Sequence, residues 1–274
     1  MESHEFPVEE DVTSVKGSVS REEYDRLQVL CDQKDQEIER MKTEFLSVAS
    51  HQFRTPLTSM NWYLEMLLSD EGAVLQERER GYVEEVYATS RRMVGLVNDL
   101  LNVSRLETGN LELEPMPAQL ETFLQTLVDE ARPIADQAGA TLAYAPPADP
   151  LPMVAIDKGM VRQVFSNLLT NAIKYSSSAG AQGKIDVSIT QEGDEVIAAI
   201  QDNGIGIPEE AKPSIFSKFY RAENAIHAAT DGSGLGLYIA HMVVTELGGR
   251  IWYESEVGTG TTFFVAFPCT SSSV

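Results

Sequence analysis

Residues 45–60 read Phe45-Leu-Ser-Val-Ala-Ser-His51-Gln-Phe-Arg-Thr-Pro56-Leu-Thr-Ser-Met60, and the rest of the chain is interpreted from them. The stretch places one histidine in a segment typical of a helix and follows it with a proline. Pro56 has no N–H to donate to the carbonyl of Gln52, so we expect the helix to bend or loosen just past His51. A lone histidine on a helix usually has no chemical role. Whether His51 has a chemical role therefore has to be judged from the sequence around it.

Upstream of this stretch, apolar residues recur at heptad spacing. The a positions are Tyr24, Cys31, Ile38 and Phe45, and the d positions are Leu27, Lys34, Met41 and Val48. Such a seam predicts a parallel two-stranded coiled coil, and therefore a homodimer, with Lys34 as a polar defect that helps fix the register. The alternative is an amphipathic helix packed within one chain. His51 falls at position g, which borders the seam and stays open to solvent on one side.

Two amphipathic helices follow the heptads. The first keeps an apolar stripe, and Ser69-Asp-Glu-Gly72 ends it; the stripe is Met60, Leu64, Leu67 and Leu68. The second is expected from about Leu75 to Leu106, and its residues available for burial are Val83, Val86, Tyr87, Val94, Val97, Leu100, Leu101 and Val103. Two helices cannot bury two such stripes by themselves. Two copies of the chain are therefore expected to form a four-helix bundle.

The second half of the chain changes to a mixed pattern. We expect helices at 120–138, 157–175 and 234–247, and strands at 110–115, 141–145, 184–190, 195–201, 250–254 and 261–267. Asp157 is typical of a helix N-cap, Glu192-Gly-Asp194 is typical of a hairpin turn, and Pro133 is expected to kink or split its helix. This order of elements predicts an α+β sandwich. The expected organisation is a disordered lead-in at 1–20, a coiled coil and helical hairpin at 21–108, the sandwich at 109–269 and a flexible tail at 270–274.

Composition limits the classes of function. The chain has 274 residues, 43% of them hydrophobic, which is typical of a folded protein, and its formal net charge of −21 disfavours nucleic acid and anionic membranes as partners. No apolar run approaches the roughly 20 residues that span a bilayer, and the N-terminus lacks a signal-peptide pattern. Cys31 and Cys269 have no metal-binding spacing. These features predict a cytoplasmic protein without a membrane segment.

Four segments of the second half have the residues of a nucleotide site. Asn167-Leu-Leu-Thr-Asn171-Ala-Ile-Lys174-Tyr175 puts two asparagines on one helix face, where neutral amide oxygens suit Mg²⁺ that borrows phosphate ligands. In Asp202-Asn-Gly204-Ile-Gly206, a carboxylate can accept a hydrogen bond from an exocyclic amine, and the glycines allow close approach to a flat base. Each segment has a plainer explanation by itself, namely a polar helix face or a glycine-rich turn.

The other two segments are also rich in glycine. Gly232-Ser-Gly234-Leu-Gly236 opens a helix whose free N–H groups can hold phosphate, and Gly258-Thr-Gly260-Thr261-Thr-Phe263 is a turn into a strand. No strand is expected directly before Gly232, as a dinucleotide-binding fingerprint requires, and no Gly-Lys-Ser/Thr follows, as a Walker A loop requires. The two commonest phosphate-binding loops are therefore excluded.

In this order, the four segments resemble the N, G1, G2 and G3 boxes of histidine-kinase ATP-binding domains. The stretch from Phe45 to Met60 resembles the H box of sensor histidine kinases, and Ile215-Phe-Ser-Lys-Phe-Tyr-Arg221 resembles the F box of the same family. The resemblance covers about Tyr24 to Pro268. It implies a dimeric helical hairpin followed by a Bergerat-type α/β sandwich.

The resemblance also implies the chemistry. It implies transfer of the γ-phosphoryl group of ATP to His51 and then to an aspartate of a response-regulator receiver domain. Its implied roles are Asn171 as the Mg²⁺ ligand, Asn167 as support for metal and phosphates, Lys174 on phosphate, Tyr175 near base or ribose, Asp202 on the adenine amine, Gly204 and Gly206 around the base, Gly232, Gly234 and Gly236 beside the phosphates, and Thr261 in the fourth segment. It further implies a mobile lid at about 221–234 and a hinge near 108–110.

One residue departs from the family's commoner pattern, which has Glu or Asp directly after the histidine. The Gln52 amide can hold the Nδ1–H of His51 but cannot act as a base near pH 7. Thr55 matches the position that family phosphatases use to orient a hydrolytic water, so a second activity toward the regulator is expected as an option. The alternatives are a catalytically weak, ATP-binding dimeric signalling scaffold and an ATPase of the chaperone or topoisomerase kind. The signal is expected from an upstream sensor domain or a sensor partner.

Overall fold

The computed structural model describes residues 26, 28–30, 34, 52–69, 75–107, 113–177, 182–229 and 232–270. His51 lies outside these residues, as do the lead-in at 1–20 and the hinge expected near 108–110. Among the heptad positions only Lys34 is described, and it is helical. Thr270, expected in the flexible tail, is instead bonded, because its N–H donates to the Met153 carbonyl over 2.7 Å.

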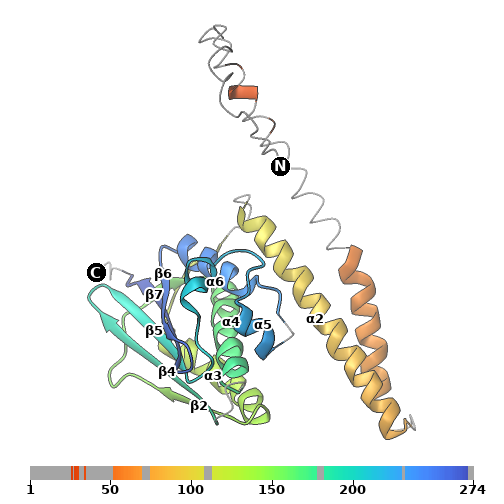
Figure 1. Ribbon diagram of the computed structural model, residues 1–274. Helices are drawn as coiled ribbons and strands as arrows, with labels where there is room; N and C mark the ends of the chain where they lie inside the picture. The colour runs from red at the N-terminus through yellow and green to blue at the C-terminus, as the bar shows by residue number, and fades with distance from the viewer. Residues whose placement is uncertain are drawn as a thin grey trace, which may run out of the picture.

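The first body is a hairpin of two helices, residues 52–69 and α2 (Glu77–Glu107). Arg54 donates to Asn98 Oδ1 over 2.6 Å, Tyr87 donates to Glu65, and Arg80 reaches the Leu68 carbonyl over 3.4 Å, all side-chain donors. As the residue numbers of the bonded pairs rise along the first helix, those of their partners fall along α2, so the two helices are antiparallel. Figure 1 shows the helix of residues 52–69 on the side of α2 that faces away from the rest of the protein.

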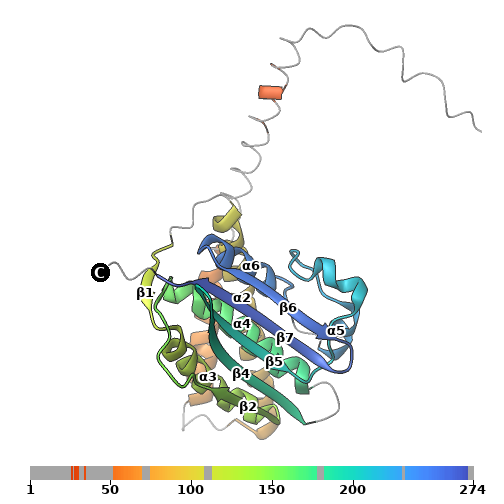
Figure 2. The same cartoon turned by 90° about the vertical axis from the view of Figure 1, so that its left-hand side faces the viewer.

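The second body contains a five-stranded sheet and a smaller two-stranded one (Figure 2). In the large sheet only β2 and β4 are parallel, and the other neighbours are antiparallel. Its strands in spatial order are β2 (Ala140–Ala145), β4 (Gly183–Glu192), β5 (Glu195–Asp202), β7 (Gly260–Pro268) and β6 (Arg250–Glu256). The small sheet pairs β1 (Met116–Ala118) with β3 (Val154–Ile156) in antiparallel fashion.

Helices cover one face of the large sheet, as Figure 2 shows behind the strands. They are α3 (Leu120–Gln137), α4 (Lys158–Ser177) and α6 (Gly236–Glu246), and the loops between β5 and α6 add the 3₁₀ helix η1 (Glu209–Ser214) and the short α5 (Glu223–Ala228). Alternate residues of β4 point into this layer, so Ile185, Val187 and Ile189 are buried. The hairpin and sandwich predicted from the sequence are therefore confirmed.

Three local expectations need correction. The strand expected at 110–115 is not formed at 113–115, because pairing begins only at Met116, where β3 supplies a three-residue partner. Neither β3 nor α5 was expected, since segments of three and six residues carry too little periodicity. Pro133 does not split α3, because the Asp129 carbonyl left without a donor lies on the exposed face of the helix.

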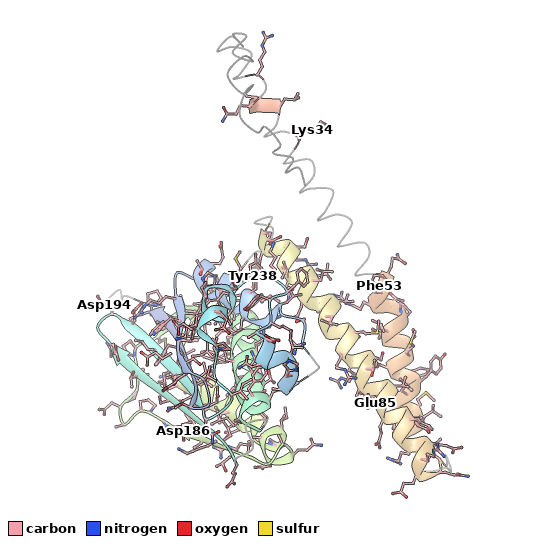
Figure 3. The ribbon with its side chains drawn as sticks, viewed as in Figure 1. Lys34, Phe53, Glu85, Asp186, Asp194 and Tyr238 are labelled. Carbon is pink, nitrogen blue, oxygen red and sulfur yellow. The ribbon has the colours of Figure 1, made fainter. Side chains whose placement is uncertain are left out.

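The hairpin and the sandwich touch at the C-terminal end of α2. The Glu107 carboxylate accepts a hydrogen bond from the Tyr238 hydroxyl over 2.8 Å and pairs with Lys218, and Figure 3 shows Tyr238 on the side of the sandwich near this end of α2. Val103 and Leu106 of α2 are buried in the same apolar cluster as the sandwich core. Across the part of the chain that the structure describes, no helix is long and apolar enough to cross a bilayer.

The core of the sandwich depends on Phe165 of α4, which is fully buried. Phe165→Ala should lower the free energy of unfolding by about 3–5 kcal/mol, because the cavity left behind adds to the lost transfer energy. Urea unfolding followed by circular dichroism measures the change. Ile134→Ala is the control, since Ile134 lies half-exposed on α3. Equal losses in the two variants would contradict the placement of Phe165.

Candidate nucleotide-binding site

A cavity of about 260 Å³ opens between α4, the loop after β5, the segment around α5 and the start of α6. Its lining comes from α2, α4, the stretch between Asp202 and Leu237, and the start of β7. Its lining is Asp99, Asn167, Asn171, Lys174, Tyr175, Asp202, Ile205, Gly206, Ile207, Ile215, Tyr220, Arg221, Ala222, Asn224, Ala225, Gly232, Ser233, Gly234, Gly236, Leu237, Thr261 and Phe263.

Helix α4 presents a polar face to this cavity. Its opposite face is buried in the core, so residues four apart on the polar face stay together beside the cavity. Asn167 Nδ2 donates to the Gly236 carbonyl over 3.3 Å, which turns its Oδ1 away from that carbonyl. The Asn171 side chain lines the cavity and has no hydrogen-bond partner among the described residues. Both amides therefore have oxygens to offer a ligand.

Asp202 ends β5 at the opposite side of the cavity and is only 8% exposed. Burial raises the pKa of Asp202 to about 6, although backbone N–H groups of Gly204 and Thr261 bond the carboxylate and oppose the shift. The Gly204 N–H lies 2.8 Å from Asp202 Oδ1. A buried carboxylate held by only two N–H groups favours a further donor, and an exocyclic amine supplies one.

Two features fix the loop that follows Asp202. Gly206 has φ +68°, and a Cβ there would lie 2.1 Å from the Glu256 carbonyl oxygen, so only glycine fits. Ser255 Oγ accepts from the Ile207 N–H over 2.8 Å, donates to the Gly260 carbonyl over 3.0 Å and lies 2.8 Å from Thr261 Oγ1. Ser255 thus joins the loop at Ile207 to the start of β7 beside Asp202. Sequence reasoning missed it, because a serine within an exposed-looking strand carries no signal.

Arg221 organises the segment expected to form the lid. Its guanidinium donates to the carbonyls of Ala225 over 3.2 Å, Ala229 over 2.5 Å and Gly232 over 3.4 Å. Burial raises the pKa of the Tyr175 hydroxyl, while the charge of Arg221 and a hydrogen bond from it lower that pKa. The Arg221 guanidinium and Lys174 Nζ both lie beside Gly232, where a Cβ would be 3.4 Å and 3.6 Å from them, so two positive groups meet at this glycine.

Most residues expected at a nucleotide site do line the cavity: Asn167, Asn171, Lys174, Tyr175, Asp202, Gly206, Gly232, Gly234, Gly236 and Thr261. Gly204 does not; it lies behind Asp202, where a Cβ would meet Asp202 Oδ1 at 2.7 Å. Gln52 and Thr55 are exposed on the hairpin and are not part of the cavity, and His51 lies outside the described residues. Asp99 of α2 was not expected here, since its helical pattern indicates only a polar neighbour of an apolar stripe.

The donor set fits a magnesium ion that shares its ligands with phosphate. Among the described residues, no group of three or more His, Cys, Asp or Glu side chains could hold a metal by itself. The oxygens of Asn167 and Asn171 would supply only part of an octahedral shell, and Mg²⁺ in proteins typically completes its shell with phosphate oxygens and water.

An antiparallel helical hairpin followed by a sandwich with this cavity is the two-domain arrangement of the histidine kinase class. Two family models match the chain: the His Kinase A (phospho-acceptor) domain over residues 41–109, and the Histidine kinase-, DNA gyrase B-, and HSP90-like ATPase over residues 156–271. The chain belongs to the sensor histidine kinase family.

Individual relatives agree with this assignment. The chain is similar to the sensor protein kinase WalK of Staphylococcus epidermidis, with 34% identity over 238 residues that cover 85% of the chain and 38% of the relative. It is similar to the circadian input-output histidine kinase CikA of Synechococcus elongatus, with 35% identity over 231 residues, 83% of the chain and 30% of the relative. The chain thus spans well under half the length of these relatives.

Among solved structures, full-length ShkA in complex with AMPPNP superposes with a TM-score of 0.68 at 29% identity, covering 84% of this chain and 47% of that one. The histidine kinase AdeS of Acinetobacter baumannii superposes with a TM-score of 0.54 at 23% identity, over 81% of this chain and 98% of that one, and it shares the fold.

The shifted pKa of Asp202 predicts how ATP affinity depends on pH. Recognition of an amine needs the ionised carboxylate, and a pKa of about 6 means that this form is lost as pH falls through that value. ATP should therefore bind more weakly at pH 5 than at pH 7.5, and Asp202→Asn should weaken binding about 10- to 100-fold at pH 7.5.

Calorimetric titration of wild type and Asp202→Asn over this range makes the measurement. The titration of the ATP phosphates is common to both proteins and cancels in the comparison. If the two proteins lose affinity in parallel as pH falls, Asp202 is not the titrating group.

Proposed function

We propose that this chain is a sensor histidine kinase core that transfers the γ-phosphoryl group of ATP to His51, and from there to an aspartate of a response-regulator receiver domain. One observation carries the proposal: four separate segments bring amide oxygens, two cations and a buried carboxylate into one cavity next to a phosphoacceptor-type hairpin. The AMPPNP complex of the similar ShkA supports ATP as the nucleotide.

The two ends of the cavity have different tasks in this proposal. Asp202 accepts from the adenine amine, and the loop held by Ser255 forms the wall beside the base. Lys174 and Arg221 lie at the other end and offset phosphate charge. Asn167 and Asn171 would hold Mg²⁺, which neutralises part of the triphosphate charge and aligns it.

His51 is the proposed acceptor of the phosphoryl group. Imidazole is a good nucleophile when neutral, and at neutral pH it largely is. Gln52 follows it directly and would hold Nδ1–H through its amide oxygen, which leaves Nε2 to attack. Thr55 follows His51 by four residues and is exposed, and in this proposal it orients water in a phosphatase reaction on the regulator.

The hairpin supports a homodimer. Both of its helices expose large apolar side chains that a single chain leaves in solvent: Met60, Trp62, Tyr63, Met66, Leu67, Tyr82, Val86, Met93 and Leu96. Large apolar side chains exposed together on both helices indicate an interaction site, and a second hairpin would cover them in a four-helix bundle. The expected partners are thus a second copy, a receiver domain and an upstream sensor domain or sensor partner, in the cytoplasm where ATP is supplied.

His51→Gln should abolish acid-labile, base-stable phosphorylation by ATP, because no other side chain is proposed as the acceptor. ATP affinity should be unchanged, since none of the described residues 52–69 lines the cavity. Incorporation of ³²P from labelled ATP and a binding titration measure the two properties. His4→Gln is the matched control and should label normally. Labelling of His51→Gln at the wild-type rate would overturn the proposal, and ATP binding without labelling of the wild type would favour a signalling scaffold.

Gln52→Glu tests whether a missing base limits the chemical step. A carboxylate there can take a proton and pair with the imidazolium that forms as phosphate arrives, so the single-turnover rate at saturating ATP should rise by up to about 100-fold. Gln76→Glu adds the same charge elsewhere on the hairpin and should have no effect. A Gln52→Glu rate equal to or below wild type would show that residue 52 serves His51 only by orientation.

A further inference from the structure

Among the described residues of the hairpin, only Asp99 lines the nucleotide cavity. It belongs to α2, whereas every other lining residue belongs to the sandwich. Gln163 of α4 donates through Nε2 to Asp99 Oδ1 over 3.1 Å, and Gln163 Oε1 accepts from Asn102 Nδ2 over 3.0 Å. This bridge fixes the carboxylate against α4.

The bridge places Asp99 at the metal end of the cavity. Gln163, Asn167 and Asn171 are spaced four apart on α4, so they share one face, with a rise of about 6 Å from each to the next. Asp99 bonds the first of the three, and the other two are the amides proposed for Mg²⁺. The carboxylate therefore extends the row of oxygen donors by one residue from a second domain.

The charge of Asp99 is poorly compensated. Burial raises the pKa of Asp99, and the hydrogen bond from Gln163 only partly opposes this shift. Within the described residues, Oδ2 has no hydrogen-bond partner. Burying the Asp99 carboxylate costs free energy, and a triphosphate in the cavity would add repulsion to that cost, because two anions in a partly buried site interact strongly. A divalent cation between them would reverse the sign of the interaction.

We propose that Asp99 is an acidic member of the metal–nucleotide site, supplied by the phosphoacceptor hairpin, that admits magnesium-bound nucleotide and rejects the metal-free triphosphate. Its free oxygen would accept hydrogen bonds from water on the metal, since Mg²⁺ keeps several waters when proteins bind it. The inference rests on the proposed function, because it assumes that the cavity takes ATP. It also links the two domains: nucleotide with metal favours α2 docked on the sandwich, and by reciprocity docking favours that ligand.

Asp99→Asn is the test, because it removes the charge and keeps the size and the acceptor for Gln163. The dissociation constant of AMPPNP is measured for the full chain by calorimetry, once with excess Mg²⁺ and once with EDTA. Loss of the charge should weaken binding with Mg²⁺ and strengthen binding with EDTA. The dissociation constant with EDTA divided by the constant with Mg²⁺ should therefore fall by on the order of tenfold or more.

Glu85→Gln is the matched control. Glu85 is also an α2 carboxylate, paired with Arg92 over 3.5 Å, but it does not line the cavity. It should leave the ratio of the two constants unchanged. Asp99→Ser is a second variant without charge and should repeat the change of ratio, while thermal unfolding reports whether each variant is folded.

The outcomes separate the inference from the function beneath it. An unchanged ratio in folded Asp99→Asn, with wild type binding AMPPNP in a Mg²⁺-dependent way, overturns the role of Asp99 and leaves the kinase proposal intact. If Asp99→Asn gained affinity for AMPPNP equally with Mg²⁺ and with EDTA, Asp99 would only repel the nucleotide, and the proposed role of Asp99 would also be overturned. Failure of wild type to bind AMPPNP under either condition would overturn both.

Discussion

Helix α4 has to serve the core and the cavity at once, and the other parts of the nucleotide site are placed relative to it. One face carries Phe165, Leu168 and Leu169, which are essentially without solvent contact and lock the helix against the sheet. The opposite face carries Asn167, Asn171 and Lys174 at the cavity. Because the interior is close-packed, the helix cannot rotate or slide without opening voids. The polar side chains are therefore positioned by hydrophobic burial that has no chemical role of its own.

The second constraint lies at the end of the sheet where β5 ends and β7 begins. The backbone of Asp202 pairs with Thr261, and the Asp202 carboxylate is bonded by N–H groups on both of its sides. Ser255 on β6 extends this tie to the loop at Ile207. Burying a carboxylate with so few donors costs stability, and it leaves an acceptor whose best partner is the ligand. The burial that raises the pKa of Asp202 would thus also give rise to the affinity for an amine proposed here.

Sequence patterns predicted most of this arrangement and failed in identifiable places. Periodicity predicted α4, the β4–β5 hairpin and the alternation of buried residues, because each depends on local spacing. The glycine-rich segments indicated the cavity because Gly206 and Gly234 have backbone conformations that other residues rarely adopt. Asp99 could not be predicted, since its partner on α4 is far away in sequence. Ser255 could not be predicted either, since its bond to Ile207 joins segments that are distant along the chain. The three-residue β3 was missed because its length is set by its partner.

The contact between α2 and the sandwich has the character of a reversible one. Its polar part is an ion pair and a hydrogen bond at Glu107 and the Gln163 bridge, and such groups exchange for water at small net cost. Its apolar part is confined to the last turns of α2, around Val103 and Leu106. Interfaces of this mixed kind between domains of one chain commonly allow relative motion. A nucleotide that reaches His51 must travel with the sandwich, so the phosphoryl transfer proposed here requires an interface that can be released and remade. The polar composition of this contact permits that, and a larger apolar contact would prevent it.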